Sequence, residues 1–284
     1  MTRVINTISG VRELVKQARS QGKRIGLVPT MGALHAGHVS LVETAKKQTD
    51  FVVVSIFVNP TQFGPNEDFA KYPRTLDADV AMCEKAGADV VFAPSAEEMY
   101  PTQQQTLVNV EKLTDCLCGA SRPGHFRGVT TVCTKLFNIV LPDIAFFGQK
   151  DAQQSIVIKR MVADLNMPLE IAVCPIVREA NGLAMSSRNK YLSDQQRQDA
   201  AAIYASLRKA EQMIKSGERT SAAIVAAMKE ILRQGGSIAT EYIHIVDAAT
   251  LADLQVVKGQ VLIAIAAKAG ATRLIDNILI DVGV

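Results

Sequence analysis

The chain of 284 residues is long enough for about two domains with a sizeable buried core. Hydrophobic residues make up 48% of it and charged residues 21%, a balance that excludes a disordered chain. The formal net charge of +3 is too small for the electrostatic footprint of a nucleic-acid binder, so we expect no nucleic-acid partner.

The cysteines and the N-terminal residues indicate a cellular compartment. The 5 cysteines are odd in number and form no CxxC pair, which favours reduced thiols over a disulfide framework or a zinc site. The N-terminal residues lack the apolar run of a signal peptide, and no segment approaches the ~20 apolar residues of a transmembrane helix. We therefore expect a cytoplasmic protein that does not bind a membrane.

Short apolar runs alternate with amphipathic segments in the first part of the chain. A helix is predicted first, on the helical spacing of Ile8, Val11, Leu14, Val15 and Ala18. Strands are predicted after it at 24–28, 51–57, 89–94, 143–147 and 169–177, with helical segments between them. Continuously apolar strands are typical of a parallel sheet that is buried on both faces. We predict that residues 1–175 form a doubly wound α/β domain.

The pattern of apolar and polar residues changes after Pro175. A polar loop leads into two long helical patterns, which begin at the candidate N-caps Ser193 and Thr220. Three strand patterns close the chain, at 240–247, 260–268 and 272–280. Residues 176–284 are therefore predicted to form a smaller C-terminal α+β domain.

A segment with two histidines, residues 29–38, follows the first long strand and precedes a helix. At this place in an open α/β sheet ligands bind, and a helix N-terminus offers amides to phosphate. His38 and Val39 stand where a P-loop needs Lys and Ser or Thr, and the segment contains no GxGxxG, so neither a P-loop nor a dinucleotide fingerprint is indicated. His35 and His38 are candidates for contact with phosphate. The alternative is a pair of capping or surface histidines.

Polar side chains suited to an anionic substrate occur in three further places. They are Asn59 and Gln62 after strand 51–57, Lys150, Asp151 and Gln154 after strand 143–147, and Ser186, Ser187 and Arg188 in the C-terminal part. Each group alone has an ordinary alternative, such as an Asn-Pro turn, a helix N-cap, a solvated lysine or a polar loop. Their joint occurrence favours a site for a nucleoside triphosphate and an acid.

Six segments, in this order, resemble the motifs of the pantoate–β-alanine ligase family: PTMGALHAGH, SIFVNPTQF, YPRT, RPGHFRGV, FFGQKDAQQ and MSSRN. The resemblance covers most of residues 24–190 and implies a Rossmann-like fold of the HxGH nucleotidyltransferase type. It also implies a cytoplasmic homodimer that uses ATP and Mg²⁺. The implied reaction condenses pantoate with β-alanine through a pantoyl adenylate, releasing AMP and pyrophosphate.

The resemblance assigns roles by motif. The residues implied in ATP binding are Met31, Gly32, Ala33, Leu34, His35, Ala36, Gly37, His38, Gly148, Gln149, Lys150, Asp151, Val177, Met185, Ser186, Ser187 and Arg188. The residues implied in catalysis are His38, as proton donor, and His35, Lys150 and Arg188, which supply positive charge. Gln62, Gln154 and Asn59 are implied in substrate binding. The metal ligands stay open. In the family's terms a carboxylate near Asp79 would help to hold Mg²⁺, and the alternative that we favour for Asp79 is an exposed helix acid.

One segment departs from the family pattern. Cys118 stands where an acidic residue is expected, which leaves the role of His125 in the same segment open. Residues 117–128 contain Gly119, Gly124 and Gly128, and we expect them to form a mobile flap that keeps water from the adenylate.

Three other functions compete with the ligase interpretation. The chain could be another HxGH nucleotidyltransferase that stops after nucleotidyl transfer, a nucleotide-binding regulator without catalysis, or an RNA-binding relative of the synthetases. A regulator would be expected to lose His38 or Lys150, and both are present. An RNA binder should show a basic face, which the small net charge does not favour.

Overall fold

The computed structural model describes residues 1–65 and 67–283. The chain divides into two compact units, residues 1–149 with 153–175 and residues 150–152 with 176–284. Within the described residues, no helix has both the length and the apolar character needed to cross a bilayer.

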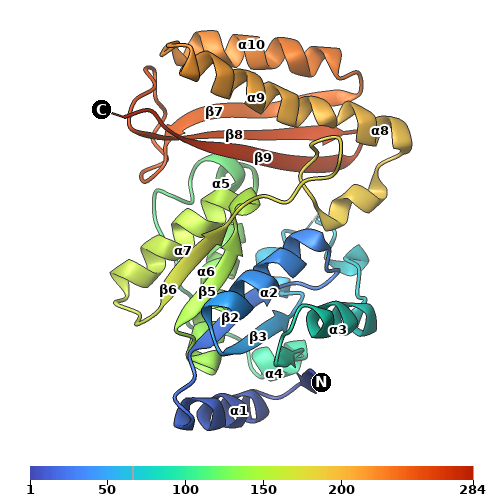
Figure 1. Cartoon of the computed structure of the whole chain (residues 1–284), viewed down its shortest axis with the longest axis vertical. Coiled ribbons are helices and arrows are strands. Elements are labelled where there is room, and N and C mark those ends of the chain that lie inside the picture. Colours follow the sequence, from blue (N-terminus) through green and yellow to red (C-terminus); the bar gives the residue numbers. More distant parts are fainter. Residues whose placement is uncertain (66, 284) are drawn as a thin grey trace. The chain divides into compact units, whose positions relative to one another are not determined.

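A six-stranded parallel sheet forms the centre of the first unit (Figure 1), in the order β1-β4-β3-β2-β5-β6. The strands are β1 Arg3–Ile5, β2 Ile25–Thr30, β3 Phe51–Ile56, β4 Val90–Phe92, β5 Ile144–Gly148 and β6 Glu170–Cys174. The predicted doubly wound α/β fold is confirmed. Strand β1 was not predicted, because three residues at a sheet edge carry no periodic signal.

Helices cover the sheet on both faces. They are α1 Ile8–Ser20, α2 Ala36–Gln48, α3 Leu76–Lys85, α4 Ala96–Met99, α5 Leu117–Ser121, α6 His125–Val140 and α7 Ala152–Asp164, with the short 3₁₀ turns η1 Pro60–Gln62, η2 Phe69–Lys71 and η3 Gln149–Asp151. Val52, Val53 and Val54 are all 0% exposed although successive side chains of a strand point to opposite faces. The sequence of β3 is apolar throughout for this reason.

The strand order places a topological switch point at β2. From β2 the chain moves to β3 and β4 on one side, and it later returns to add β5 and β6 on the other side. Strand β2 therefore pairs with both β3 and β5. Ligands of open α/β sheets bind outside the carboxyl ends of the strands at such a point. Residues 31–38 follow β2 directly, and Gln149 follows β5.

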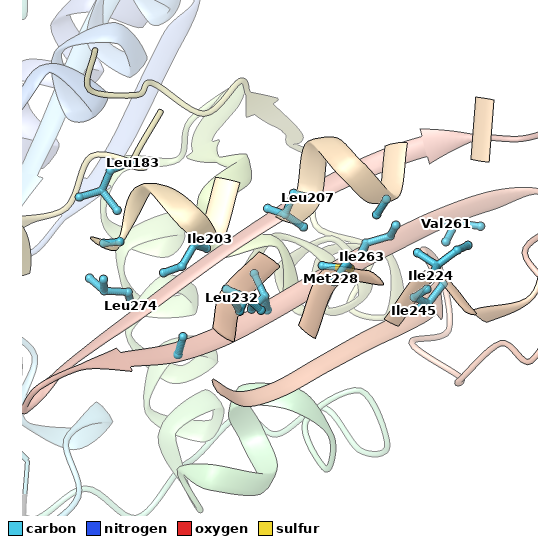
Figure 2. Close-up of a cluster of buried hydrophobic side chains, with 14 of the residues drawn as sticks. Leu183, Ile203, Leu207, Ile224, Met228, Leu232, Ile245, Val261, Ile263 and Leu274 are labelled. Carbon is cyan, nitrogen blue, oxygen red and sulfur yellow. The ribbon is translucent and has the colours of Figure 1, made fainter. Parts of the chain in front are cut away.

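The second unit is a three-stranded antiparallel sheet with helices on one face (Figure 1). Its elements are η4 Ser187–Tyr191, α8 Asp194–Asp199, α9 Ala201–Lys215, α10 Ser221–Gln234, β7 Ile238–Asp247, β8 Gln260–Ala269 and β9 Thr272–Asp281. Figure 2 shows the core, in which Ile203 and Leu207 of α9 and Met228 of α10 lie with Ile263 of β8. The three predicted strands are confirmed.

The helical part of this unit differs from the prediction in one respect. The pattern that begins at Ser193 forms two helices, α8 and α9, which meet at Ala200. Ser193 is the N-cap of α8 as predicted, and it forms a capping box in which the Ser193 Oγ accepts from the Gln196 amide and the Gln196 side chain accepts from the Ser193 amide. Thr220 occupies the N-cap position of α10.

Candidate active site

The two histidines of the 29–38 segment lie together at the start of α2. The Nδ1 atom of His35 accepts a hydrogen bond from the Gly37 amide at 3.2 Å, so His35 caps the helix and its Nδ1 carries no proton. The imidazole rings of His35 and His38 are 4.0 Å apart between centroids. While Nδ1 caps the helix, the Nε2 atom of His35 keeps a hydrogen that it can donate. The capping role and a role toward phosphate are therefore compatible.

The turn before these histidines is held by a buried carboxylate. Gly32 and Ala33 adopt left-handed conformations, with φ of 80° and 50°. The Asp79 carboxylate accepts hydrogen bonds from the amides of Ala33, at 2.9 Å, and Leu34, at 2.8 Å. Asp79 is 1% exposed, so its interpretation as an exposed helix acid was wrong. No local pattern reveals this contact, because 45 residues separate Asp79 from Leu34.

Gln62 lies beside the same turn. Its Nε2 donates to the Met31 sulfur at 3.0 Å, and its Oε1 accepts from the Asn59 Nδ2 at 3.1 Å. A thioether is a weak acceptor, so a carboxylate or hydroxyl oxygen would be the better partner for this amide. The structure thus brings the end of β2 and the end of β3 together through Met31 and Gln62, two of the residues predicted to bind ligands.

Asn59 is 1% exposed, and its side chain is engaged by the protein. Besides Gln62, its Nδ2 donates to the Gly128 carbonyl at 3.2 Å, and its Oδ1 accepts from the Tyr100 hydroxyl at 2.9 Å. The Oδ1 also accepts from the Thr61 amide at the start of η1. Asn59 therefore forms the Asn-Pro turn that the sequence offered as the alternative, and it also orients the amide of Gln62.

Strand β5 ends at Gly148, where the predicted lysine and acid follow in η3. The Lys150 ammonium lies 3.6 Å from the Asp151 carboxylate, and the two side chains are 22% and 48% exposed. The carbonyl of Lys150 accepts a hydrogen bond from the Asn277 side chain at 2.9 Å. Gln154 is half-buried in the first turn of α7.

The Ser-Ser-Arg loop of the second unit is a hydrogen-bonded turn. The Met185 amide donates to the Val177 carbonyl at 3.0 Å, which pairs two of the residues predicted to bind ATP. The Ser186 hydroxyl accepts from the Arg188 amide at 3.3 Å and caps η4. Ser187 is the first residue of this turn, and it is half-buried.

Sequence reasoning missed the residues that support this loop. Asn189 is 4% exposed, and its Nδ2 donates to Glu179 at 2.8 Å and to the Ala184 carbonyl at 3.1 Å. Arg197 donates to both carboxylate oxygens of Glu179 and to the Asn189 carbonyl, each at 2.8 Å. Asn189 follows Arg188 directly in the MSSRN segment. Its place in that segment was the one sequence feature that could have indicated a role in this loop.

The expected flap is anchored at its first turn. Gln153 is 6% exposed, and it accepts from the Cys118 amide and donates to the Cys116 carbonyl. A Cβ on Gly119 would lie 1.9 Å from the Thr114 carbonyl oxygen, so this glycine permits close packing. Mobility of residues 117–128 stays a prediction, with Gly124, at φ 80°, as the residue that allows a left-handed turn before α6.

Gly128 is also a packing glycine, inside α6. A Cβ there would lie 2.3 Å from the Thr61 carbonyl oxygen. The helix approaches the η1 turn too closely here for any side chain, so Gly128 is needed for packing.

Three of the cysteines are core thiols. Cys83, Cys133 and Cys174 are buried, and burial raises the pKa of Cys133 to about 12. Burial and the nearby charge of Asp79 raise the pKa of Cys83 to about 12 as well. Among the residues that the structure describes, no three His, Cys, Asp or Glu side chains are arranged to hold a metal ion.

A parallel sheet with a histidine-bearing helix N-terminus at its switch point defines a class, the nucleotide-binding α/β enzymes. Comparison with known proteins defines the family. A sequence model of the pantoate–β-alanine ligases matches residues 3–279, so the chain belongs to the pantoate–β-alanine ligase family and is an ATP-dependent ligase.

Relatives resemble the chain over its full length. The pantothenate synthetase of Thermoanaerobacter pseudethanolicus is 57% identical over 97% of this chain and 98% of its own. The crystal structure of the Thermus thermophilus enzyme is 43% identical, with a TM-score of 0.93 over 100% of both chains. The Francisella tularensis ligase, crystallised with β-γ ATP and β-alanine, is 35% identical, with a TM-score of 0.80 over 98% of both chains.

Proposed function

We propose that the protein joins pantoate to β-alanine in two steps through a pantoyl adenylate. The observation that carries this proposal is the contact of Gln62 with Met31, which sets an amide suited to an acid substrate beside the histidine-bearing turn. A nucleotidyltransferase that stops after the first step would need a subsite for the acceptor of the nucleotidyl group but none for the amine that reacts in the second step. The family relationship favours complete ligation.

We assign ATP to two sets of residues. In the first unit these are residues 31–38, Gly148 and Gln149. In the second unit they are Lys150, Asp151, Val177 and residues 185–188. The amides at the start of α2 and the cationic side chains offer fixed positive charge to the triphosphate.

Gln62 and Gln154 are proposed to bind pantoate, with Gln62 also contacting β-alanine. A neutral amide both donates and accepts, so it can serve the carboxylate and the hydroxyl groups without adding charge beside the reacting anion. Asn59 belongs to this subsite as the residue that orients the Gln62 amide.

In the first step a pantoate carboxylate oxygen attacks the α-phosphorus of ATP, and the bond to pyrophosphate breaks. Charge grows on the leaving pyrophosphate, so His38, His35, Lys150 and Arg188 are proposed to stabilise it, with a proton supplied by His38. In the second step the β-alanine amine attacks the acyl carbon, the bond to AMP breaks, and the nitrogen loses a proton.

Mg²⁺ is proposed to enter with ATP. It commonly binds nucleotide phosphates and water together with one or two carboxylates, so it needs no cluster of protein ligands. The Asp79 carboxylate already accepts hydrogen bonds from two amides of the loop, so it is poorly suited to serve as a ligand of Mg²⁺.

We further propose a cytoplasmic homodimer, as the family resemblance implies. Sedimentation of the purified chain tests the dimer.

Isotope exchange tests the two-step scheme. With ATP, Mg²⁺ and pantoate but without β-alanine, the enzyme should exchange labelled pyrophosphate into ATP, because exchange requires only the adenylate. Mass spectrometry after addition of β-alanine should detect pantothenate and AMP. Exchange that depends on β-alanine would replace the adenylate scheme by a concerted reaction.

A further inference from the structure

A row of side chains in the first unit ends on the main chain of Gln62. The Arg122 guanidinium forms a two-pronged ion pair with the Glu67 carboxylate, at 2.7 and 2.6 Å. Another nitrogen of the guanidinium, Nη1, lies 3.0 Å from the Nε2 atom of His125. The Nδ1 atom of His125 lies 2.9 Å from the Gln62 carbonyl oxygen. Glu67, Arg122 and His125 thus form a chain of contacts that ends on the carbonyl group of Gln62.

The partners on both sides of His125 fix its protonation. A carbonyl oxygen can only accept, so the Nδ1 atom must carry a hydrogen and donate it to Gln62. A guanidinium can only donate, so the Nε2 atom must present its lone pair to Arg122. His125 is therefore neutral, with its hydrogen on Nδ1. Glu67 holds the guanidinium in the orientation that this arrangement needs.

Two further contacts fix the same turn. The Nη2 atom of Arg122 also points at the Gln62 carbonyl, at 3.4 Å. A Cβ on Gly128 would lie 2.6 Å from the Gln62 Cα, so α6 packs directly against the main chain there. The Gln62 peptide is consequently held from one side by donors and from another by a helix backbone. A rotation of this peptide would swing the Gln62 side chain away from Met31.

We infer that Arg122 and His125 are positioning residues for pantoate recognition, which act by holding the carbonyl of Gln62 so that its side-chain amide meets the substrate. The inference rests on the proposed role of Gln62 in binding pantoate. Neither residue is assigned a contact with substrate. A displacement of about 1 Å in a positioning group is enough to lower an enzymatic rate about 100-fold, so a fixed peptide is functionally significant.

Two amide replacements of His125 distinguish positioning from packing. The amide nitrogen of Asn can occupy the place of the imidazole Nδ1 and donate to the Gln62 carbonyl, whereas the longer Gln places its amide nearer to Nε2. His125→Gln should raise the KM for pantoate about tenfold, the size expected for one lost hydrogen bond, with the KM for ATP within about twofold. His125→Asn should restore the KM for pantoate to within about threefold of the wild type.

Two arginines near the start of α6 provide a matched pair of variants. Arg122→Lys removes the fork that joins Glu67 and His125, so it should raise the KM for pantoate selectively. Arg127 is exposed in the first turn of α6, and Arg127→Lys should leave both Michaelis constants unchanged.

A double-mutant cycle with Gln62→Ala decides the mechanism. When the Gln62 amide is absent, His125→Gln should cause no further rise in the KM for pantoate. Additive effects, or equal weakening of pantoate and ATP, would overturn the inference and indicate a loss of general stability. If Gln62→Ala alone leaves the KM for pantoate unchanged, the proposed role of Gln62 fails. If Gln62→Ala raises that constant while His125→Gln and Arg122→Lys do not, only the inference fails.

Discussion

The carboxylate of Asp79 accepts the backbone amide of Leu34 at 2.8 Å and thereby joins the first turn of α3 to the loop that precedes α2. The neighbouring amide of Ala33 binds the other carboxylate oxygen. This loop contains two consecutive left-handed residues, one of which has a Cβ. Such a conformation is unfavourable for an L-residue, and it persists where its surroundings hold it.

Asp79→Asn should therefore loosen the histidine loop. The amide nitrogen of Asn would face a backbone N–H, and a buried donor without an acceptor costs about 1–3 kcal/mol. We expect a lower free energy of unfolding and a reduced kcat/KM for ATP. Asp77→Asn, in the same helix turn but exposed, should change neither value. Loss of stability with normal ATP kinetics would restrict Asp79 to a role in the fold.

His38 and Lys150 are predicted to act on charge that develops in the transition state. Replacing either by Ala should lower kcat and kcat/KM together, by about 100-fold, as for other preorganised donors. Steady-state kinetics at saturating pantoate and β-alanine will measure this. Lys159→Ala, at an exposed position of α7, is the matched control for Lys150. A raised KM for ATP with normal kcat would mean that the residue only binds the nucleotide.

Arg188→Lys should behave as a loss of function. An ammonium group cannot reproduce the two parallel hydrogen bonds that a guanidinium makes with phosphate oxygens, so we expect kcat/KM for ATP to fall at least about tenfold. Lys190 is exposed in the same η4 turn, and Lys190→Arg should leave the kinetics unchanged. Normal activity of Arg188→Lys would contradict a two-pronged contact.

The ion pair of Glu67 with Arg122 should make stability depend on pH. The hydrogen bond from Arg122 lowers the pKa of Glu67 below its ordinary value of 4.5. In the window between the two pKa values the unfolded chain binds more protons than the folded one, so stability rises with pH there. The stability difference between wild type and Glu67→Gln should be complete above pH 4.5 and should disappear as the pH falls through the folded pKa.

Denaturant unfolding at a series of pH values measures this difference. Glu84→Gln, whose parent carboxyl is exposed in α3, serves as a control for acid effects elsewhere in the chain. A constant difference across the window would show that the ion pair contributes nothing through Glu67 ionisation.

The sequence by itself determined the elements and the chemistry of the candidate site. Apolar runs such as 51–57 predict buried strands, because a strand whose sheet is covered on both faces is apolar throughout. The start of the helix at His35 is likewise indicated by the residues on either side of it. The family resemblance also depends only on local motifs. In each of these cases the sequence pattern and the feature that it predicts lie within the same few consecutive residues.

Only the tertiary structure decided which groups hold the site in place. Asp79 has the sequence signature of an exposed acid in a first helix turn, yet its partners are 45 and 46 residues away. Arg122 and His125 reach the Gln62 carbonyl across 60 and 63 residues. Every residue type offers the same backbone carbonyl, and every type except proline offers the same amide. The type of residue at such a position therefore does not indicate that its main chain is hydrogen-bonded to a distant side chain. Periodicity and motif spacing therefore cannot reveal these hydrogen bonds, and the packing of α3 and α6 against the strand ends determines them.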